Sequence, residues 1–201
     1  SDSSTLSGHL AKLLSEEEYV AETLGLNWGE FKLGPNLIEN GRFAQWKADT
    51  PLGFTFLKYP GVNGIEGEFA GGNQKLNGNA ARILTLRSMA ASDGSLPYAE
   101  YASNKIIINH QQYLVSVEYC LSNFEAGHVL VHLGEYDIPG GASLLNVFLP
   151  DEKEGCSTAR MIITGPIQPT AVSLVVRNWG NGDVSIQRVA LQEIVEEAPS
   201  R

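Results

Sequence analysis

The second half of the chain is a succession of short segments patterned like β-strands, and no other feature limits the possible folds as much. In residues 112–121 Tyr113, Val115, Val117 and Tyr119 share one face, and Ser116 and Glu118 the other. Residues 128–133 follow the same period, with Val129, Val131 and Leu133 on one face. A period of two predicts a strand with one buried face. Further strands are expected at residues 105–110, 143–149, 159–164, 171–178 and 184–194.

Turn signals separate these segments, and no helical periodicity lies between them. The Asn181–Gly182 pair predicts a hairpin between the last two strands, because both residues adopt positive φ readily. Only 18% of the residues are charged, below the usual value of about 25%, which suits an all-β protein. Short strands at fairly regular spacing predict a β-sandwich or a β-barrel.

The first part of the chain is patterned as a helix that starts at Ser15 or Glu16 and ends at Leu24. Ser15 and Glu18 form the S-x-x-E pattern of a capping box, and Gly25 is a natural C-terminal cap. We therefore expect a helical leader over residues 1–32, a β-domain over residues 33–195 and a flexible tail over residues 196–201. The glycine-rich residues 60–104 predict long loops around one strand at residues 81–87.

Three segments carry a resemblance to a known family. Residues 36–46 read NLIENGRFAQW, residues 109–120 read NHQQYLVSVEYC and residues 182–194 read GDVSIQRVALQEI. In this order they resemble the first, central and last strands of carbohydrate-binding modules with a galactose-binding-like jelly roll. The resemblance implies an all-β fold, a jelly-roll β-sandwich of two antiparallel sheets, with the N-terminal helix as an addition.

The same family commonly holds a structural calcium ion, and this sequence departs from the pattern that binds it. Ala44 stands where the family has a glutamate, and Gln187 and Arg188 stand where it has two aspartates. Calcium needs several oxygen ligands, so we expect this site to be absent. Glu39 and Asp49 are close in sequence and are the alternative source of ligands.

A second resemblance concerns the leader. Residues 13–31, LLSEEEYVAETLGLNWGEF, resemble soluble segments of bacterial membrane glycosyltransferases. This resemblance implies that the chain is part of a larger envelope protein.

The net charge of −9 limits the partners. The phosphates of a nucleic acid and an anionic membrane surface would both repel the chain. We expect no nucleic-acid partner, and any membrane contact only through another part of the parent protein. Oligosaccharides or polysaccharides remain as possible partners; the oligomeric state is left open.

The two cysteines, Cys120 and Cys156, lie in no Cys/His ligand pattern, so a zinc site is not expected. Two separate buried thiols are the preferred interpretation. A disulfide is the alternative, and it would suit an exported protein.

No catalytic set is found, so neither an enzyme nor a cofactor is predicted. Nucleophile-elbow, P-loop and Rossmann patterns are absent from the sequence. His128 and His132 share one face of a strand but would lie about 13 Å apart, too far to chelate one metal ion. Glu118 and Glu135, expected on adjacent strands, are interpreted as solvated carboxylates, although a glycosidase pair about 5–9 Å apart is the alternative.

Candidate ligand-binding residues follow from the chemistry of sugars, whose C–H faces stack on aromatic rings and whose hydroxyls bond polar side chains. Trp179 is expected at a hairpin tip, next to Arg177, which points to the opposite face of its strand from Leu174 and Val176. Trp46 and Tyr113 are expected in the core. The predicted ligand-binding residues are Arg177, Trp179, Tyr136, His132 and Tyr98.

Three functions remain from these observations. The first is a non-catalytic, extracytoplasmic module of an envelope or secreted protein that binds glycan. The second is a structural or interaction domain of a membrane-bound glycosyltransferase without its own sugar affinity. The third is an enzyme that acts on polysaccharide.

Overall fold

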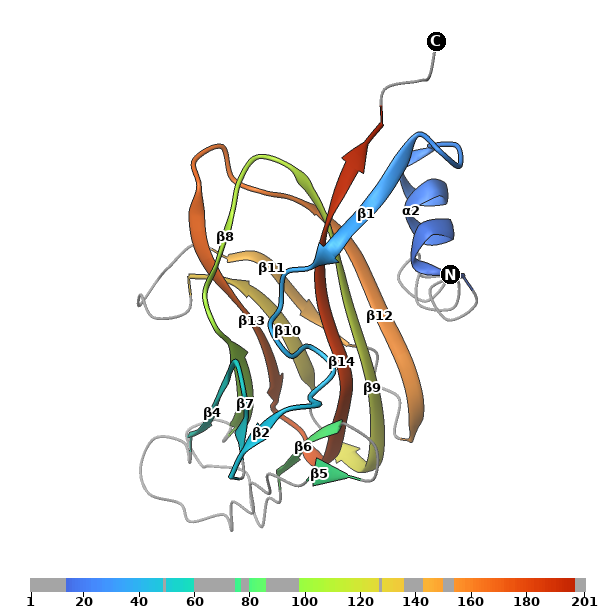
Figure 1. Cartoon of the computed structure of the whole chain (residues 1–201). Helices are drawn as coiled ribbons and strands as arrows, with labels where there is room; N and C mark the ends of the chain where they lie inside the picture. Colours follow the sequence, from blue (N-terminus) through green and yellow to red (C-terminus); the bar gives the residue numbers. More distant parts are fainter. Residues whose placement is uncertain are drawn as a thin grey trace.

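The computed structural model describes residues 14–48, 50–59, 75–76, 80–85, 98–126, 128–135, 143–149 and 154–197. These residues form two antiparallel sheets packed face to face, with one helix, α2 (Glu16–Leu24), beside one of them (Figure 1). The fold is therefore the all-β sandwich with an added N-terminal helix that the sequence predicts.

The first sheet, called here the β9 sheet, has six strands in the order β12-β9-β14-β6-β5, with β1 also paired to β14. Its neighbouring strands are antiparallel throughout. The strands are β1 (Phe31–Asn36), β5 (Lys75–Leu76), β6 (Ala80–Thr85), β9 (Gln112–Ala126), β12 (Gly155–Thr164) and β14 (Asn181–Glu196).

The second sheet, called here the β13 sheet, also has six strands, in the order β11-β10-β13-β7-β4, with β8 paired to β13. A separate two-stranded ribbon joins β2 (Trp46–Lys47) and β3 (Thr50–Pro51). The strands of the β13 sheet are β4 (Phe54–Tyr59), β7 (Tyr98–Ser103), β8 (Ile106–Ile108), β10 (Val129–Gly134), β11 (Ser143–Phe148) and β13 (Thr170–Asn178).

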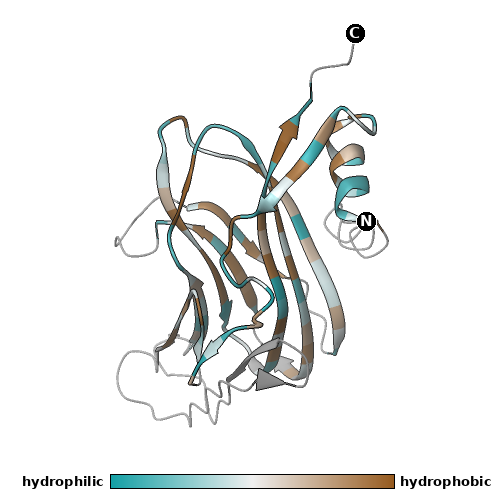
Figure 2. Ribbon diagram, viewed as in Figure 1, coloured by the Kyte–Doolittle hydropathy of each residue, from teal (hydrophilic) through white to brown (hydrophobic). Residues whose placement is uncertain are grey.

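The main core lies between the two sheets and is built by the alternation seen in the sequence. Tyr113, Val115 and Val117 of β9 point inward and are almost fully buried, opposite Leu174 and Val176 of β13. Apolar and polar residues alternate along β9 and β14 in Figure 2. The core position predicted for Tyr113 is confirmed, and Trp46 packs partly buried against the same cluster.

Helix α2 begins and ends where the sequence predicts. Glu18 N donates to Ser15 Oγ at 3.1 Å, Ser15 N donates to Glu18 Oε2 at 2.6 Å, and Gly25 ends the helix with a φ of 67°. The helix buries Val20 completely in a second apolar cluster on the outer face of the β9 sheet. The helix is therefore packed on the sandwich through its own small core.

The connection between β13 and β14 is a crossing between the sheets, and the predicted hairpin is wrong. The side chain of Asn178 is fully buried; its Oδ1 accepts from Gly180 N at 2.7 Å and its Nδ2 donates to Gly182 O at 3.2 Å. A Cβ on Gly180 would lie 1.9 Å from the ring of Phe124. Asn181 and Gly182 are the first residues of β14, and the connection is only residues 179–180. It leads from the β13 sheet into the β9 sheet, so β13 and β14 do not pair with each other.

The segment expected to be the first strand is mostly a loop. Only Asn36 of residues 36–45 is in a strand, at the end of β1. Asn36 Oδ1 accepts from Leu191 N at 3.0 Å, and Asn40 adopts a positive φ of 53° while its Nδ2 donates to the carbonyls of Gln45 and Leu52. The asparagines of the NLIENGRF segment therefore form the hydrogen bonds that hold this loop together and attach it to β14.

Part of the region expected to be loop is an internal strand, β7, which lies between β13 and β4. Its sequence, YAEYAS, shows no apolar–polar alternation because both faces of the strand are buried over 99–103. The predicted strand at residues 81–87 corresponds to β6. Residues 60–74, 77–79 and 86–97 lie outside the described residues.

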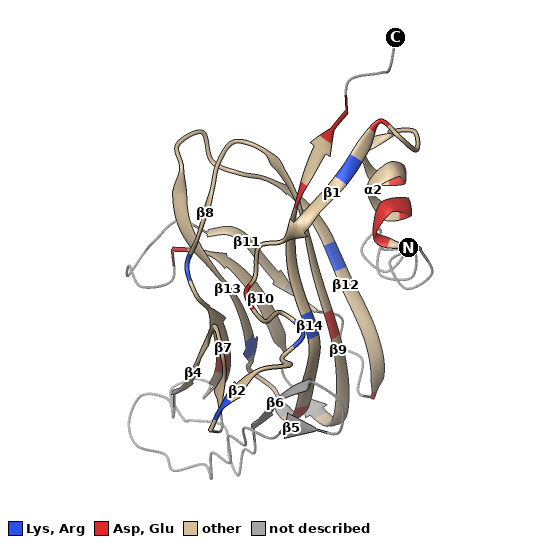
Figure 3. Cartoon of the chain, viewed as in Figure 1, with Lys and Arg blue, Asp and Glu red and all other residues tan. Residues whose placement is uncertain are grey.

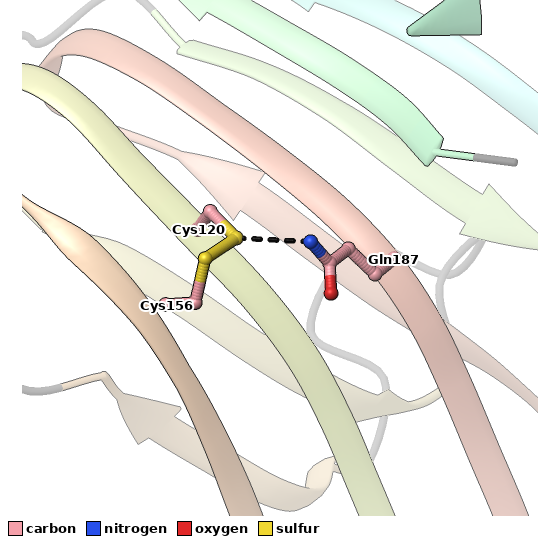
Figure 4. The surroundings of a disulfide bond; sticks show 3 residues. All are labelled: Cys120, Cys156 and Gln187. Carbon is pink, nitrogen blue, oxygen red and sulfur yellow. Dashed lines mark hydrogen bonds between the residues drawn. A yellow bond between two sulfur atoms is a disulfide. The ribbon is translucent and has the colours of Figure 1, made fainter. Parts of the chain in front are cut away.

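Cys120 and Cys156 form a disulfide, so the preferred interpretation of two separate buried thiols is wrong (Figure 4). They are paired residues on β9 and β12, with Cα atoms 3.9 Å apart. Cys156 is exposed, and Gln187 Nε2 donates to Cys120 Sγ at 3.0 Å. The bond lies on the outer face of the β9 sheet, where the register of two strands distant in sequence brings the sulfurs together.

The first strand starts before the expected boundary at residue 33. Phe31 and Lys32 pair with Glu196 and Val195 of β14. Glu197 N then donates to Glu30 O at 2.7 Å, which joins the start and the end of the described sandwich. Residues 198–201, the rest of the predicted tail, lie outside the described residues.

Candidate functional site

The candidate site lies on the outer face of the β13 sheet, the face turned away from the core. Along β13, Leu174 and Val176 point inward, so Val175 and Arg177 point outward. The register pairs Arg177 with Leu130 of β10 and with Glu100 of β7. Directly opposed residues of antiparallel strands share a face, so the outer face brings Arg177 and Glu100 together.

Arg177 and Glu100 form an ion pair at the centre of this face. Arg177 Nε donates to Glu100 Oε2 at 2.5 Å, with 19% of the arginine side chain exposed and none of the glutamate. Burial raises the pKa of Glu100, and the hydrogen bond and charge of Arg177 offset this effect only in part. The carboxylate therefore depends on Arg177 to stay ionised.

Two aromatic rings contact the guanidinium of Arg177 from adjacent sides. Its Cζ lies 4.1 Å from the ring centroid of Tyr98 and 4.9 Å from that of Trp179. The rings are 6.0 Å apart and meet edge to face at 82°. A cation over aromatic faces is attracted by their quadrupoles, so the arginine and both rings support one another.

Trp179 reaches this cluster because of the tight crossing between the sheets. Asn178, which fixes that turn, is buried on the inner face, and Trp179 N donates to His128 O at 2.8 Å. The backbone of Trp179 is thus bonded to the segment before β10. Trp179 therefore follows the C-terminal end of β13, an internal strand, and does not lie at a hairpin tip.

His132 lies on the same outer face, on β10. Its Nδ1 is 3.2 Å from Ser143 Oγ of β11. Burial lowers the pKa of His132, and the charge of Arg177 lowers it further. The imidazole is therefore kept neutral and can both donate and accept a hydrogen bond.

The structure brings together four of the five predicted ligand-binding residues. Arg177, Trp179 and Tyr98 form one cluster, and His132 lies on the same face and is influenced by the charge of Arg177. Tyr136 lies outside the described residues. Tyr98 is the first residue of β7, within the region expected to form long loops.

Glu100 is the residue that the sequence analysis missed. Its signal was a single carboxylate inside the small, otherwise uncharged YAEYAS segment. A charge that is fully buried needs a partner, so assignment of this segment as an internal strand would have predicted a buried ion pair.

The residues at the family's calcium positions do not fit a calcium ion. Ala44 has no side-chain oxygen, and the amide nitrogen of Gln187 points to Cys120 Sγ. The guanidinium of Arg188 is bound to Glu16 and Glu118. Glu39 accepts a hydrogen bond from Asn104 Nδ2 at 3.2 Å, and Asp49 lies outside the described residues. Within the described ranges, no group of three or more His, Cys, Asp or Glu residues could hold a metal ion.

The carboxylates considered for catalysis are separated by the fold. Glu118 lies on the outer face of the β9 sheet, where it binds Arg188, whereas Glu135 follows β10 of the other sheet. The expectation of adjacent strands is wrong, because β9 and β10 follow each other in sequence but enter different sheets. These two residues do not flank one site.

Comparisons with known proteins support the fold. No protein-family model matches the chain, and no curated protein matches its sequence. A solved CBM4 structure is similar, with a TM-score of 0.53 and 12% identity, over 78% of this chain and 99% of that chain. A family 16 carbohydrate-binding module gives 0.47 and 13%, over 78% and 99%. The enzymatically active domain of tailspike protein 4 from bacteriophage CBA120 gives 0.49 and 9%, over 79% and 21%.

At these identities the likeness to the CBM4 structure defines the fold alone. The chain has the jelly-roll sandwich of carbohydrate-binding modules, as the three sequence segments imply. In the part of the chain that the structure describes, no helix has the length and apolarity to cross a membrane.

Proposed function

We propose that this chain is a non-catalytic carbohydrate-binding module that acts outside the cytoplasm and binds an oligosaccharide or polysaccharide on the outer face of the β13 sheet. The observation that carries the proposal is the cluster of Arg177, Tyr98 and Trp179, with Glu100 beneath it. Aromatic rings offer apolar surface to sugar C–H groups, and the guanidinium and the imidazole of His132 offer hydrogen bonds to hydroxyls.

The donors of Arg177 support this function. Its guanidinium bonds the described part of the chain through Nε alone. The Nη1 and Nη2 groups form a planar fork of donors that can bond two neighbouring oxygens at once. A ligand with adjacent hydroxyl groups suits such a fork.

The carboxylate of the site supports binding over catalysis. A glycosidase needs one carboxyl group that can protonate the glycosidic oxygen and a second that acts as nucleophile or base. Glu100 is fully buried beneath Arg177 and engaged by it. It therefore acts on the arginine and has no exposed surface to offer to a sugar.

The disulfide supports a location outside the cytoplasm. Disulfides persist in oxidising compartments and are rare in reducing ones. The Cys120–Cys156 bond is on the outer face of a sheet, and Cys156 is exposed, so reducing agents of a cytosol would reach it.

A second function is favoured by a specific observation. Tyr98 and Trp179 are half-buried and their rings are engaged with Arg177. This arrangement also suits a structural or interaction domain, such as an appendage of a membrane-bound glycosyltransferase, that has no sugar affinity of its own.

A glycan array with the wild type, Trp179→Ala and Trp28→Ala tests the proposal. Trp28 is a matched control because it is 67% exposed on the turn between α2 and β1, away from the cluster. We expect the wild type and Trp28→Ala to bind the same glycans and Trp179→Ala to lose them. Absence of any wild-type signal would leave the interaction domain as the function, and equal binding by Trp179→Ala would move the site elsewhere.

A further inference from the structure

Two arginines on opposite faces of the sandwich are bound to glutamates in different ways. On the β9 sheet, both terminal nitrogens of Arg188 are used: Nη1 donates to Glu16 and Glu118, and Nη2 donates to Glu16 and Gln192. On the β13 sheet, Glu100 takes only Nε of Arg177. The terminal nitrogens of Arg188 are thus bonded within the protein. Those of Arg177 are not bonded to Glu100.

The position of Glu100 explains why it binds Arg177 through Nε and not through the terminal nitrogens. Glu100 lies on β7, directly opposite Arg177 in the register and buried at the level of the sheet. A carboxylate there meets the guanidinium at Nε, and the rings of Tyr98 and Trp179 hold its plane. These contacts use Nε and the ring-facing sides of the guanidinium, so we expect a ligand to meet its Nη edge.

We infer that Glu100 is a positioning residue of the glycan site: its ionised carboxylate orients Arg177 against the two rings so that Nη1 and Nη2 bond the ligand, and loss of that charge releases the guanidinium. This inference rests on the proposed function for its ligand but not for its geometry. It gives the site a dependence on pH that acts through a residue the sugar does not touch.

The charged groups around Glu100 set the direction of this dependence. Arg177 on β13 faces it, and on β10 the pKa of His132 is lowered by burial and by the charge of Arg177. On β4, the residue opposite Glu100 is the apolar Leu57. Burial raises the pKa of Glu100, so its charge is lost on acidification before that of an ordinary glutamate. Affinity should therefore fall as the pH falls through this raised pKa.

Folding stability moves in the other direction. A carboxyl group whose pKa is raised in the folded state binds its proton more tightly there than in the unfolded chain. Protonation of Glu100 therefore adds to the stability of the fold while it weakens the site. If Glu100 had only a structural role, its protonation would not lower the affinity for ligand while raising the stability of the fold.

The first measurement needs no ligand. The nitrogen-15 NMR signal of Arg177 Nε, assigned by its loss in Arg177→Lys, is followed in the full chain between about pH 4 and pH 8. We expect one titration step with a midpoint above that of an ordinary glutamate, and no step in Glu100→Gln. A signal that does not change with pH, or that changes equally in Glu100→Gln, would overturn the inference.

The second measurement is calorimetric binding of a cello-, xylo- or manno-hexaose by the wild type, Glu100→Gln and Glu16→Gln. We expect Glu100→Gln to weaken binding about tenfold, the size of one hydrogen bond to a charged group, and to remove the pH dependence. Glu16→Gln, the control from the other face, should keep both. Wild-type affinity that is constant with pH contradicts the inference. If no hexaose binds the wild type and the array is also empty, the proposed function fails, and the NMR titration still decides the role of Glu100.

Discussion

The outer faces of the two sheets carry the same kinds of charged residue, an arginine with buried or half-buried glutamates. They differ in what surrounds the arginine. On the β9 sheet, α2 carries acidic residues (Figure 3) and covers an apolar cluster. It places Glu16 on Arg188, whose side chain is only 12% exposed. On the β13 sheet, Arg177 contacts two rings and binds a glutamate of its own sheet. The helix covers part of the first face, and the second face carries the candidate site.

The pKa values of the two glutamates show what this difference means physically. Burial raises the pKa of Glu16, but the hydrogen bonds and charges of Arg188, with help from Ser116 and Arg160, outweigh it, so the pKa is lowered. For Glu100 burial is the larger effect and the pKa is raised. A carboxylate with a lowered pKa stabilises the fold when ionised, whereas one with a raised pKa opposes it. Ionised Glu16 on the β9 face therefore stabilises the fold, whereas ionised Glu100 on the β13 face is unfavourable in the folded state.

Among substitutions on the outer face of the β9 sheet, loss of the disulfide should lower the unfolding free energy most. The bond joins residues 36 apart in sequence, and a loop of that length is worth about 4 kcal/mol of unfolding free energy. We expect the double variant Cys120→Ser, Cys156→Ser to lose this amount in urea denaturation under oxidising conditions. Its glycan binding should stay unchanged, since the bond is on the other sheet. Equal stability of the double variant and the wild type would show that the bond does not restrain the unfolded chain.

Removal of the arginine that joins the helix to the sheet should be the next largest effect. Arg188→Leu leaves Glu16 and Glu118 without their cation, and loss of one partner from a buried ion pair costs about 3 kcal/mol. The control Lys32→Leu breaks the Lys32–Glu197 pair, in which the two side chains are 64% and 46% exposed, and should change the unfolding free energy by less than about 0.5 kcal/mol. A similar loss in both variants would contradict the role of Arg188.

The apolar contact of the helix should contribute less. Val20→Ala removes two methyl groups from a fully buried side chain in the small cluster and should cost about 2 kcal/mol. Glu22→Ala, an exposed position on the same helix, is the control and should be close to neutral. If urea denaturation shows no difference between these variants, α2 is not part of the cooperative fold.

The smallest effect separates the two faces by sign. At pH 7, Glu16→Gln should lower the unfolding free energy by about 1.5 kcal/mol, because it removes charge-assisted hydrogen bonds. Glu100→Gln should not lower it, since the ionised form of Glu100 is the unfavourable one in the fold. In the wild type, the contribution of Glu16 is lost as the pH falls from the ordinary glutamate value through its lowered pKa. Thermal unfolding of both variants across that range checks the two signs; a loss in both would remove the contrast.

Local patterns predicted the elements that are stabilised by neighbours in sequence. The capping box of α2 lies where the sequence predicts, and so do strands such as β9 and β10. In each of them the pattern of neighbouring residues shows directly which side chains are buried or capped. The strand β7 escaped because both of its faces are buried, so its burial leaves no alternation in the sequence. The cluster of Arg177 and Trp179 was predicted from residue types, but Glu100 was not, because its partner lies 77 residues away.

By itself, the sequence determined the all-β class, the helix with its caps, the inward faces of the best strands and the residue types suited to a glycan. These depend on the period of apolar residues and on local turn chemistry, which one sequence contains. The tertiary structure decided the disulfide, the crossing at residues 178–182, the packing of α2 on part of one face and the ion pair at the centre of the other face. Each of these depends on the register between strands far apart in the chain, and the free energy that selects a register comes from the whole packed core.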